Sequence, residues 1–182
     1  GKLRYTSLSK KIKKYLQEDE QFWNIISDEN FILFQSFQRI YIYDTKTEKF
    51  KIVKSFPYIF KCFTIDNHIV FQSIGKGLFE IVDGKIKPIC SDSRIKNNRI
   101  TEIYTSKQNW LLQTEKAGIF KLENNVIQLF TFNDAVTSNT VFCSKKLKSG
   151  DIALGTISNG LFIITPDGKT KYHFTQSKGL GN

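Results

Sequence analysis

The sequence feature that most constrains the fold is an internal repeat. Four segments share one pattern, in which an apolar run, a polar pair, a short loop and a second apolar run follow one another; they are residues 31–44, 68–82, 109–122 and 151–165. The polar pairs recur at steps of 37, 41 and 42 residues and are Gln35-Ser36, Gln72-Ser73, Gln113-Thr114 and Gly155-Thr156. A chain with this period is an array of similar units, each of which needs its neighbours to bury its apolar faces.

Each copy divides into four short strands. The predicted strands are residues 60–65, 68–73, 77–82 and 85–90 in the second copy, and 140–146, 151–156, 160–165 and 169–174 in the fourth. Turn-forming residues such as Asp66-Asn67 and Asp83-Gly84 separate them. Consecutive apolar residues within the middle strands indicate burial on both faces, as between stacked blades. A four-stranded meander of about 40–50 residues is typical of a propeller blade, so we predict an all-β fold, a β-propeller fragment of about four blades.

The repeat sets the expected organisation of the partial propeller, residues 1–182. Blades are predicted at residues 22–59, 60–98, 99–139 and 140–182. Residues 1–8 resemble the outer strand of the fourth copy and are predicted to be the outer strand of a preceding blade. Residues 9–21 lack β-branched runs and contain good helix formers, which predicts a helical or linker segment.

Methionine is absent, including at position 1, and we therefore expect the chain to be part of a longer protein. The remaining blades and other domains of that protein are its expected partners. The outer faces of the first and last copies should be exposed, with apolar residues such as Leu161 and Ile163 on the last. Self-association is expected, because a blade cannot bury its faces alone.

The fourth copy resembles the repeat of the two-component regulator propeller family. Gly155-Thr156, Gly160-Leu161-Phe162 and the closing residues 179–182 match its pattern, and the earlier copies match it more weakly. The tryptophan position of that repeat is occupied by Leu33, Val70, Leu111 and Ala153, and Trp110 lies one residue earlier. The resemblance implies the extracytoplasmic (periplasmic) sensor region of a membrane-anchored two-component regulator. It also implies signal transduction, a histidine kinase domain elsewhere in the parent protein, and a response to oligosaccharides.

The residues themselves provide no catalytic constellation. His68 and His173 are the only histidines, and no nucleophile, phosphate-binding or metal-binding motif accompanies them. We therefore assign no catalytic residue, no metal ligand and no cofactor, and we do not expect this segment to be an enzyme. The three cysteines, Cys62, Cys90 and Cys143, and the tryptophans Trp23 and Trp110 are interpreted as core residues.

Binding residues are expected where propeller loops gather. The turns between second and third strands and the links between blades emerge on one face, and their candidate ligand-binding residues are Phe37, Arg39, Lys76, Arg99, Lys116 and Asn159. Their cations suit an acidic oligosaccharide, and Phe37 could stack on a sugar ring. The net charge of +10 also fits a lysine-rich solvated surface. Nucleic acid is the least favoured partner, because no basic motif interleaved with aromatic residues is present.

The leading hypothesis is a non-catalytic sensor propeller that binds an oligosaccharide. The alternative is a propeller scaffold for protein–protein interaction. A glycan sensor should show a polar cleft with one or two exposed aromatic residues, whereas a scaffold should show a broad apolar patch.

Overall fold

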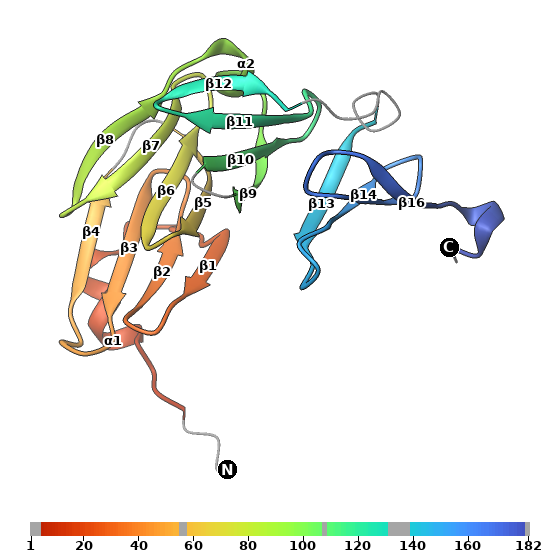
Figure 1. The fold of residues 1–182 in the computed structure, drawn as a ribbon. Helices are drawn as coiled ribbons and strands as arrows, with labels where there is room; N and C mark the ends of the chain where they lie inside the picture. Colours follow the sequence, from red (N-terminus) through yellow and green to blue (C-terminus); the bar gives the residue numbers. More distant parts are fainter. Residues whose placement is uncertain (1–4, 55–57, 107–108, 131–138, 181–182) are drawn as a thin grey trace.

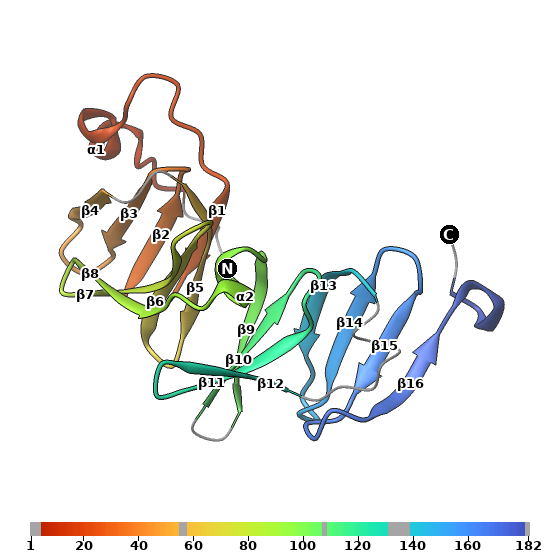
Figure 2. The same cartoon turned by 90° about the horizontal axis from the view of Figure 1, so that it is seen from above.

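The computed structural model describes residues 5–54, 58–106, 109–130 and 139–180. Within them the chain forms four antiparallel sheets, each a meander of four strands (Figure 1). The predicted all-β propeller fragment of about four blades is confirmed. We call the sheets blades I to IV in chain order. In Figure 2 they follow one another in an arc, with blade I and blade IV at its two ends.

The sixteen strands are divided equally among the blades. Blade I contains β1 (Asn24–Ser27), β2 (Phe31–Gln35), β3 (Arg39–Asp44) and β4 (Phe50–Lys54). Blade II contains β5 (Ile59–Ile65), β6 (His68–Ser73), β7 (Gly77–Val82) and β8 (Lys85–Cys90). Blade III contains β9 (Ile100–Ser106), β10 (Asn109–Thr114), β11 (Ile119–Glu123) and β12 (Val126–Leu129). Blade IV contains β13 (Val141–Lys146), β14 (Ile152–Thr156), β15 (Leu161–Ile164) and β16 (Thr170–Phe174).

The helical elements are short. They are α1 (Ser9–Ile12), η1 (Lys13–Tyr15), α2 (Ser93–Lys96) and η2 (Gln176–Lys178). The predicted helical or linker segment is therefore helical only as far as Tyr15. Of the predicted outer strand at residues 1–8, residues 1–4 lie outside the described residues, and residues 5–8 form no strand. An outer strand needs a third strand of its own blade to pair with, and none precedes it in this sequence.

Consecutive apolar residues in the middle strands pack against different neighbouring blades. Val70 and Phe71 are both fully buried in β6, but Val70 packs in the core between blades II and III, and Phe71 packs in the core between blades I and II. Leu112 and Leu111 of β10 divide in the same way between the II/III core and the III/IV core. Alternation of side chains along a strand is the cause. The cores of this fold therefore lie between sheets.

A buried glutamine joins blade I to blade II. The Gln35 amide nitrogen donates to the carbonyl oxygens of Ile59 (3.3 Å) and Phe60 (3.1 Å), and its amide oxygen accepts from the Cys62 backbone N–H at 2.8 Å. These groups belong to the innermost strand of the next blade. The side chain thus satisfies backbone groups that the sheet itself leaves unpaired at this point.

Gln72 makes the same kind of connection from blade II to blade III. Its amide nitrogen donates to the carbonyl oxygens of Ile95 (2.6 Å) and Asn98 (2.7 Å), and its oxygen accepts from the Ile100 N–H at 2.7 Å. In blade III the equivalent Gln113 is buried, but its amide oxygen has no partner among the described residues. Gly155 occupies this position in blade IV. The glutamine of the polar pair in the first two copies therefore bonds each blade to the next.

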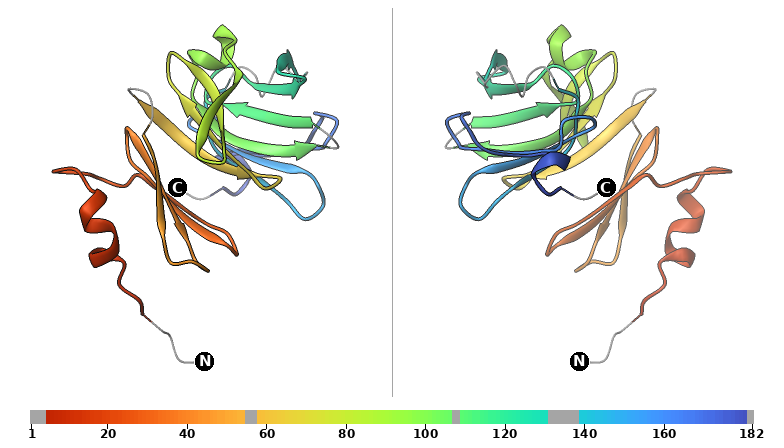
Figure 3. Two further views of the ribbon diagram at one scale, coloured as in Figure 1. Left: turned by 90° about the vertical axis from the view of Figure 1, so that its left-hand side faces the viewer. Right: turned by 90° about the vertical axis from the view of Figure 1, so that its right-hand side faces the viewer.

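The N-terminal segment, residues 9–22, covers the outer face of blade I, the face turned away from blade II (Figure 3). Phe22 packs at 5.5 Å from the ring of Phe34 and edge-on at 5.4 Å from that of Tyr41, and Tyr15 lies 6.2 Å from Phe50. Tyr41 is consequently 0% exposed. The expectation of an exposed outer face on the first blade is wrong, because the chain folds back over it.

Polar contacts fasten the N-terminal segment to the same face. The Tyr41 hydroxyl donates to Glu20 Oε2 at 2.5 Å, and Arg39 Nη1 donates to the Tyr15 carbonyl oxygen at 3.2 Å. Burial, together with the bond to Glu20, raises the pKa of Tyr41 to about 12. Lys11 forms an ion pair with Glu48. The segment therefore occupies a position that a neighbouring blade would take in a propeller.

Blade IV has no such cover among the described residues. Its face toward blade III contains Leu154 and Phe162, whereas the opposite face carries Tyr172 (53% exposed) and Phe174, beside the partly buried Leu161 and Ile163. Phe142 is 74% exposed at a bulge in β13. The expected apolar face at this end is present.

Candidate functional site

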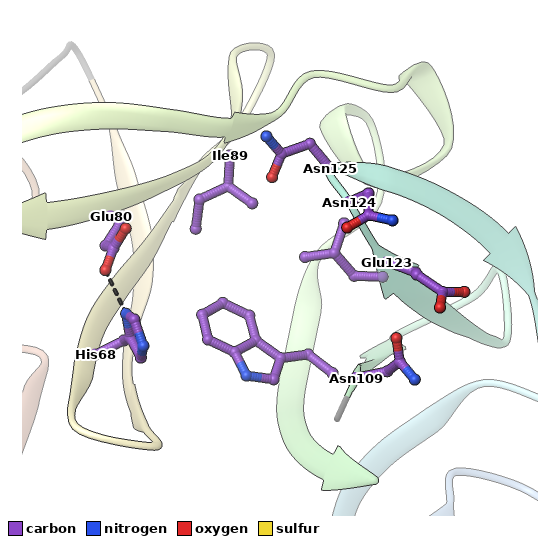
Figure 4. Close-up of a pocket in the computed structure, with 9 residues that line it drawn as sticks. His68, Glu80, Ile89, Asn109, Glu123, Asn124 and Asn125 are labelled. Atoms are coloured by element: carbon purple, nitrogen blue, oxygen red, sulfur yellow. Dashed lines mark hydrogen bonds and ion pairs between the residues drawn. The ribbon is translucent and has the colours of Figure 1, made fainter. Parts of the chain in front are cut away.

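A groove of about 490 Å³ lies between blades II and III. We call it the interblade groove, and its lining residues are His68, Glu80, Ile89, Asn109, Trp110, Leu122, Glu123, Asn124 and Asn125. Figure 4 shows His68 and Glu80 on one side and Asn109, Glu123 and Asn124 on the other. The volume lies within the roughly 300–1,000 Å³ of small-molecule sites.

Strand ends and a tight turn position the polar lining. His68 and Asn109 open β6 and β10, and Glu123 ends β11. Asn124 and Asn125 form the two-residue turn into β12 and have φ values of 49° and 65°. Asparagine tolerates this left-handed conformation, and two such residues in succession make the turn that suits the twist of a hairpin. The turn therefore fixes where both amides stand.

Trp110 is held in place by groups of blade II. Its indole Nε1–H donates to Asp66 Oδ2 at 3.2 Å, while Asp66 Oδ1 accepts from the Thr105 hydroxyl at 2.8 Å. The His68 ring meets the indole edge-on at 5.4 Å, and His68 Nδ1 is hydrogen-bonded to Glu80. Asp66, expected only as a turn residue, thus also orients the aromatic wall of the groove.

Several polar groups of the interblade groove remain available to a ligand. The side-chain amides of Asn109, Asn124 and Asn125 make no hydrogen bond to any described residue. Each amide offers two donors and an acceptor. Glu123 is paired with Lys121 at 2.8 Å. Free amides, carboxylates, one aromatic side chain and the apolar Ile89 and Leu122 line the groove together, which suits a small molecule rich in hydroxyl groups.

The groove is acidic. Glu80 and Glu123 line it, and Asp66 lies behind Trp110. In the described part of the chain, no group of three or more His, Cys, Asp or Glu side chains could hold a metal ion. A sulfated or uronate ligand would meet carboxylates of the same sign here.

The predicted binding residues lie elsewhere, on the face that carries the turns between second and third strands. We call this face the rim. Backbone hydrogen bonds run along it: the N–H groups of Ile59, Glu115 and Val141 donate to the carbonyl oxygens of Phe37, Arg99 and Glu115, respectively. Phe37 and Asn159 line two separate hollows of about 320 and 550 Å³. The rim is thus continuous, but its candidate residues do not share one cavity.

The four predicted cations differ in their surroundings. Arg39 is bonded to the Tyr15 carbonyl, and Arg99 stands over the Phe60 ring at 5.2 Å and 3.8 Å from Glu115. Lys76 and Lys116 are exposed in turns of different blades. The Asn159 carbonyl oxygen lies 2.8 Å from His173 Nε2. Arg39 and Arg99 are therefore already engaged within the chain.

Three interpretations of core residues need correction or refinement. Trp23 precedes β1 and is 58% exposed, and Cys143 is exposed, so neither is a core residue. Trp110 is partly buried and lines the groove. Its signal was in the sequence: it lies one residue before the usual tryptophan position, and a shift of one residue turns a side chain to the other face of the sheet. Leu111 accordingly faces blade IV and Trp110 faces blade II.

Comparison with known proteins places the fold. No family model matches the chain, and no curated protein matches its sequence. The extracellular domain of a putative one-component system from B. thetaiotaomicron superposes with a TM-score of 0.63 at 17% identity over 91% of this chain and 24% of its own. A second structure, described as the extracellular domain of a putative hybrid two-component system of that organism, gives 0.55 at 19% identity over 76% of this chain and 20% of its own.

The WD40 β-propeller domain of Doa1 is also similar, with a TM-score of 0.60 at 12% identity over 83% of this chain and 52% of its own. The chain spans about a quarter of the first of these structures and about half of the propeller domain. None of the helices in the described ranges is long and apolar enough to cross a bilayer. The chain thus has a β-propeller fold, similar to that of the extracellular domain of a putative two-component system.

Proposed function

We propose that this chain is a non-catalytic, ligand-binding part of the extracytoplasmic sensor propeller of a signalling regulator, and that it binds a neutral oligosaccharide in the interblade groove. The observation that carries the proposal is the interblade groove itself, which is lined by three side-chain amides without a described partner and by a tryptophan held by Asp66. Fold similarity to extracellular domains of putative one- and two-component systems supports the signalling context.

The groove has the character expected of a glycan site. Sugar hydroxyls donate to carboxylates and exchange hydrogen bonds with amides, and an aromatic side chain packs against the apolar face of a sugar ring. Glu80 and Glu123 make a neutral sugar a better occupant than an acidic one. An acidic oligosaccharide at the rim, near Lys76 and Arg99, remains a separate proposal for the same module.

The alternative, an interaction scaffold, requires a broad apolar patch. The face of blade IV around Tyr172 and Phe174 is apolar, but in a propeller that face is where another blade packs. The polar groove therefore favours the glycan proposal over the scaffold.

The test is a calorimetric titration of the purified chain with neutral, uronate-containing and sulfated oligosaccharides of equal length at two salt concentrations. We expect the neutral oligosaccharides to bind most tightly and with little salt dependence. Asn124→Gly keeps the left-handed turn but removes one amide, and it should weaken binding about five-fold, the effect of losing roughly 1 kcal/mol.

Asn67→Gly is the matched control, because Asn67 has φ 64° in the turn before β6 and does not line the groove. Its affinity for the neutral oligosaccharides should equal that of the unaltered chain. Tighter binding of acidic oligosaccharides, weakened by Lys76→Ala and Arg99→Ala but not by Asn124→Gly, would move the site to the rim and refute the groove.

A further inference from the structure

Three aromatic side chains in mutual contact are exposed on the rim of blade I. Trp23, Phe37 and Tyr58 are 58%, 40% and 39% exposed, and the Phe37 ring centroid lies 4.8 Å from that of Trp23 and 5.3 Å from that of Tyr58. They come from the approach to β1, the turn between β2 and β3, and the approach to β5. A continuous aromatic surface of this kind is unusual for a side exposed to water, where large apolar groups normally occur singly.

A polar hollow of about 320 Å³ adjoins this surface at Phe37. Its other walls are residues 17–21 of the N-terminal segment with Ser36 and Gln38. Glu20 is engaged with the Tyr41 hydroxyl, but Glu18 and Asp19 form no ion pair with any described residue. We call the three rings together with Glu18 and Asp19 the aromatic–acidic patch.

This patch is opposite in charge to the chain as a whole. The chain has a net charge of +10, and at other places on the surface a cation of the chain itself stands over an aromatic ring. These pairs are Lys11 with Tyr43, Lys61 with Phe63, Arg94 with Phe120, and Arg99 with Phe60. Among the described residues, no lysine or arginine stands over Trp23, Phe37 or Tyr58. Ring faces and carboxylates that attract cations are here left without one.

We propose that the aromatic–acidic patch binds a polypeptide segment of a partner protein through a lysine or arginine side chain. The partner's side chain lies against the exposed aromatic rings, and its charged group also approaches the carboxylates of Glu18 and Asp19 in the adjoining hollow. Charge complementarity selects this occupant over an acidic or neutral segment. The patch lies on the rim of blade I, whereas the interblade groove lies at the opposite ends of strands in blades II and III, so this inference does not depend on the glycan proposal.

The test titrates the whole chain with four Gly/Ser-based peptides that carry two arginines, two lysines, two glutamines or two glutamates. Binding is measured by calorimetry at low and high salt. We expect the arginine and lysine peptides to bind, with affinity falling as salt rises, and the other two not to bind. The double variant Glu18→Gln/Asp19→Asn should weaken binding of the arginine peptide about ten-fold, and it should leave the fold intact because both side chains are exposed.

Asp28→Asn/Glu29→Gln is the matched control, since it changes the net charge equally at the exposed turn between β1 and β2. It should leave binding of the arginine peptide unchanged. Phe37→Ala should weaken that binding as well, which separates a specific patch from general charge attraction. Equal binding of the glutamine peptide, equal effects of the two double variants, or no binding of any peptide at millimolar concentration would each overturn the proposal. A neutral sugar that bound there and was lost with Phe37→Ala would do the same.

Discussion

Blade I and blade IV are built from the same four-stranded pattern, yet the outer face of blade I is covered and that of blade IV is exposed. The N-terminal segment covers the outer face of blade I and buries Tyr41 completely, whereas Phe142 and Tyr172 of blade IV remain more than half exposed. The inward connections differ too, since Gln35 makes three hydrogen bonds to blade II while the amide oxygen of Gln113 lacks a described partner. One end of the arc is closed by its own chain, and the other offers an apolar face to whatever packs there.

The largest expected effect tests the closure of blade I. Tyr41→Ala should lower the free energy of unfolding by about 3–5 kcal/mol, as for other fully buried aromatic residues. Tyr172→Ala should change it by less than about 0.5 kcal/mol, as expected for an exposed side chain. Urea denaturation followed by circular dichroism measures both. Similar losses for the two variants would mean that the outer faces are equivalent in solution.

Substitution of the buried glutamines tests whether blade IV is bonded to blade III less firmly than blade III is bonded to blade II. Gln72→Ala leaves two carbonyl oxygens and one N–H without their partner and should cost about 2–3 kcal/mol of unfolding free energy. Gln113→Ala should cost about 1 kcal/mol, because its amide oxygen has no described bond to lose and its amide nitrogen donates only to the adjacent Thr114 carbonyl oxygen, at 2.6 Å. The same denaturation measurement decides between them, and an equal cost would show that all the blade interfaces are bonded alike.

The open face of blade IV should cause self-association. Light scattering of the unaltered chain is expected to show a mass that rises with concentration, and Tyr172→Glu/Phe174→Glu should reduce that rise by placing charges on the apolar face. Gln128→Glu, on the exposed side of β12, adds a charge away from this face and serves as the control. A monomer at all concentrations would show that the face is not adhesive.

The smallest effect is a pH dependence at the closed end. Partial burial alone would raise the pKa of Glu20, but hydrogen bonds from Ser36, Tyr41 and Gln17 outweigh it and hold the pKa below its ordinary value of 4.5. A lowered pKa in the folded state means that the carboxylate stabilises the fold at neutral pH and that this contribution is lost as the pH falls from 4.5 through the lowered pKa. The difference in Tm between the unaltered chain and Glu20→Gln should therefore shrink from pH 6 to pH 3. A difference that stays constant across this range would show that ionised Glu20 does not help to hold the N-terminal segment on blade I.

The strands were predictable because their signals are local. The predicted second, third and fourth strands of the second copy coincide with β6, β7 and β8, since turn residues and alternation depend only on neighbours in the sequence. The cover over blade I was not predictable in this way. Phe22 reaches Phe34 and Tyr41 across the fold, and the aromatic side chains on that face look in the sequence like an ordinary interface between blades.

The site was less predictable than the fold. The rim was the expected location from topology, and Phe37 is exposed there, but Arg39 and Arg99 are occupied by partners that no local pattern specifies. The interblade groove depends on contacts between residues about forty positions apart, such as Trp110 with Asp66. The one local clue was the displaced tryptophan.

The turn formed by Asn124 and Asn125 affects how a ligand of the groove would associate and what its binding would do to the two blades. Its backbone angles leave no loose loop to fold over the ligand, so association should follow a single kinetic phase. Because the two walls of the groove belong to separate sheets, a ligand bound at the proposed site would bridge blades II and III. Binding there would therefore hold the two blades together more firmly and raise the stability of their interface.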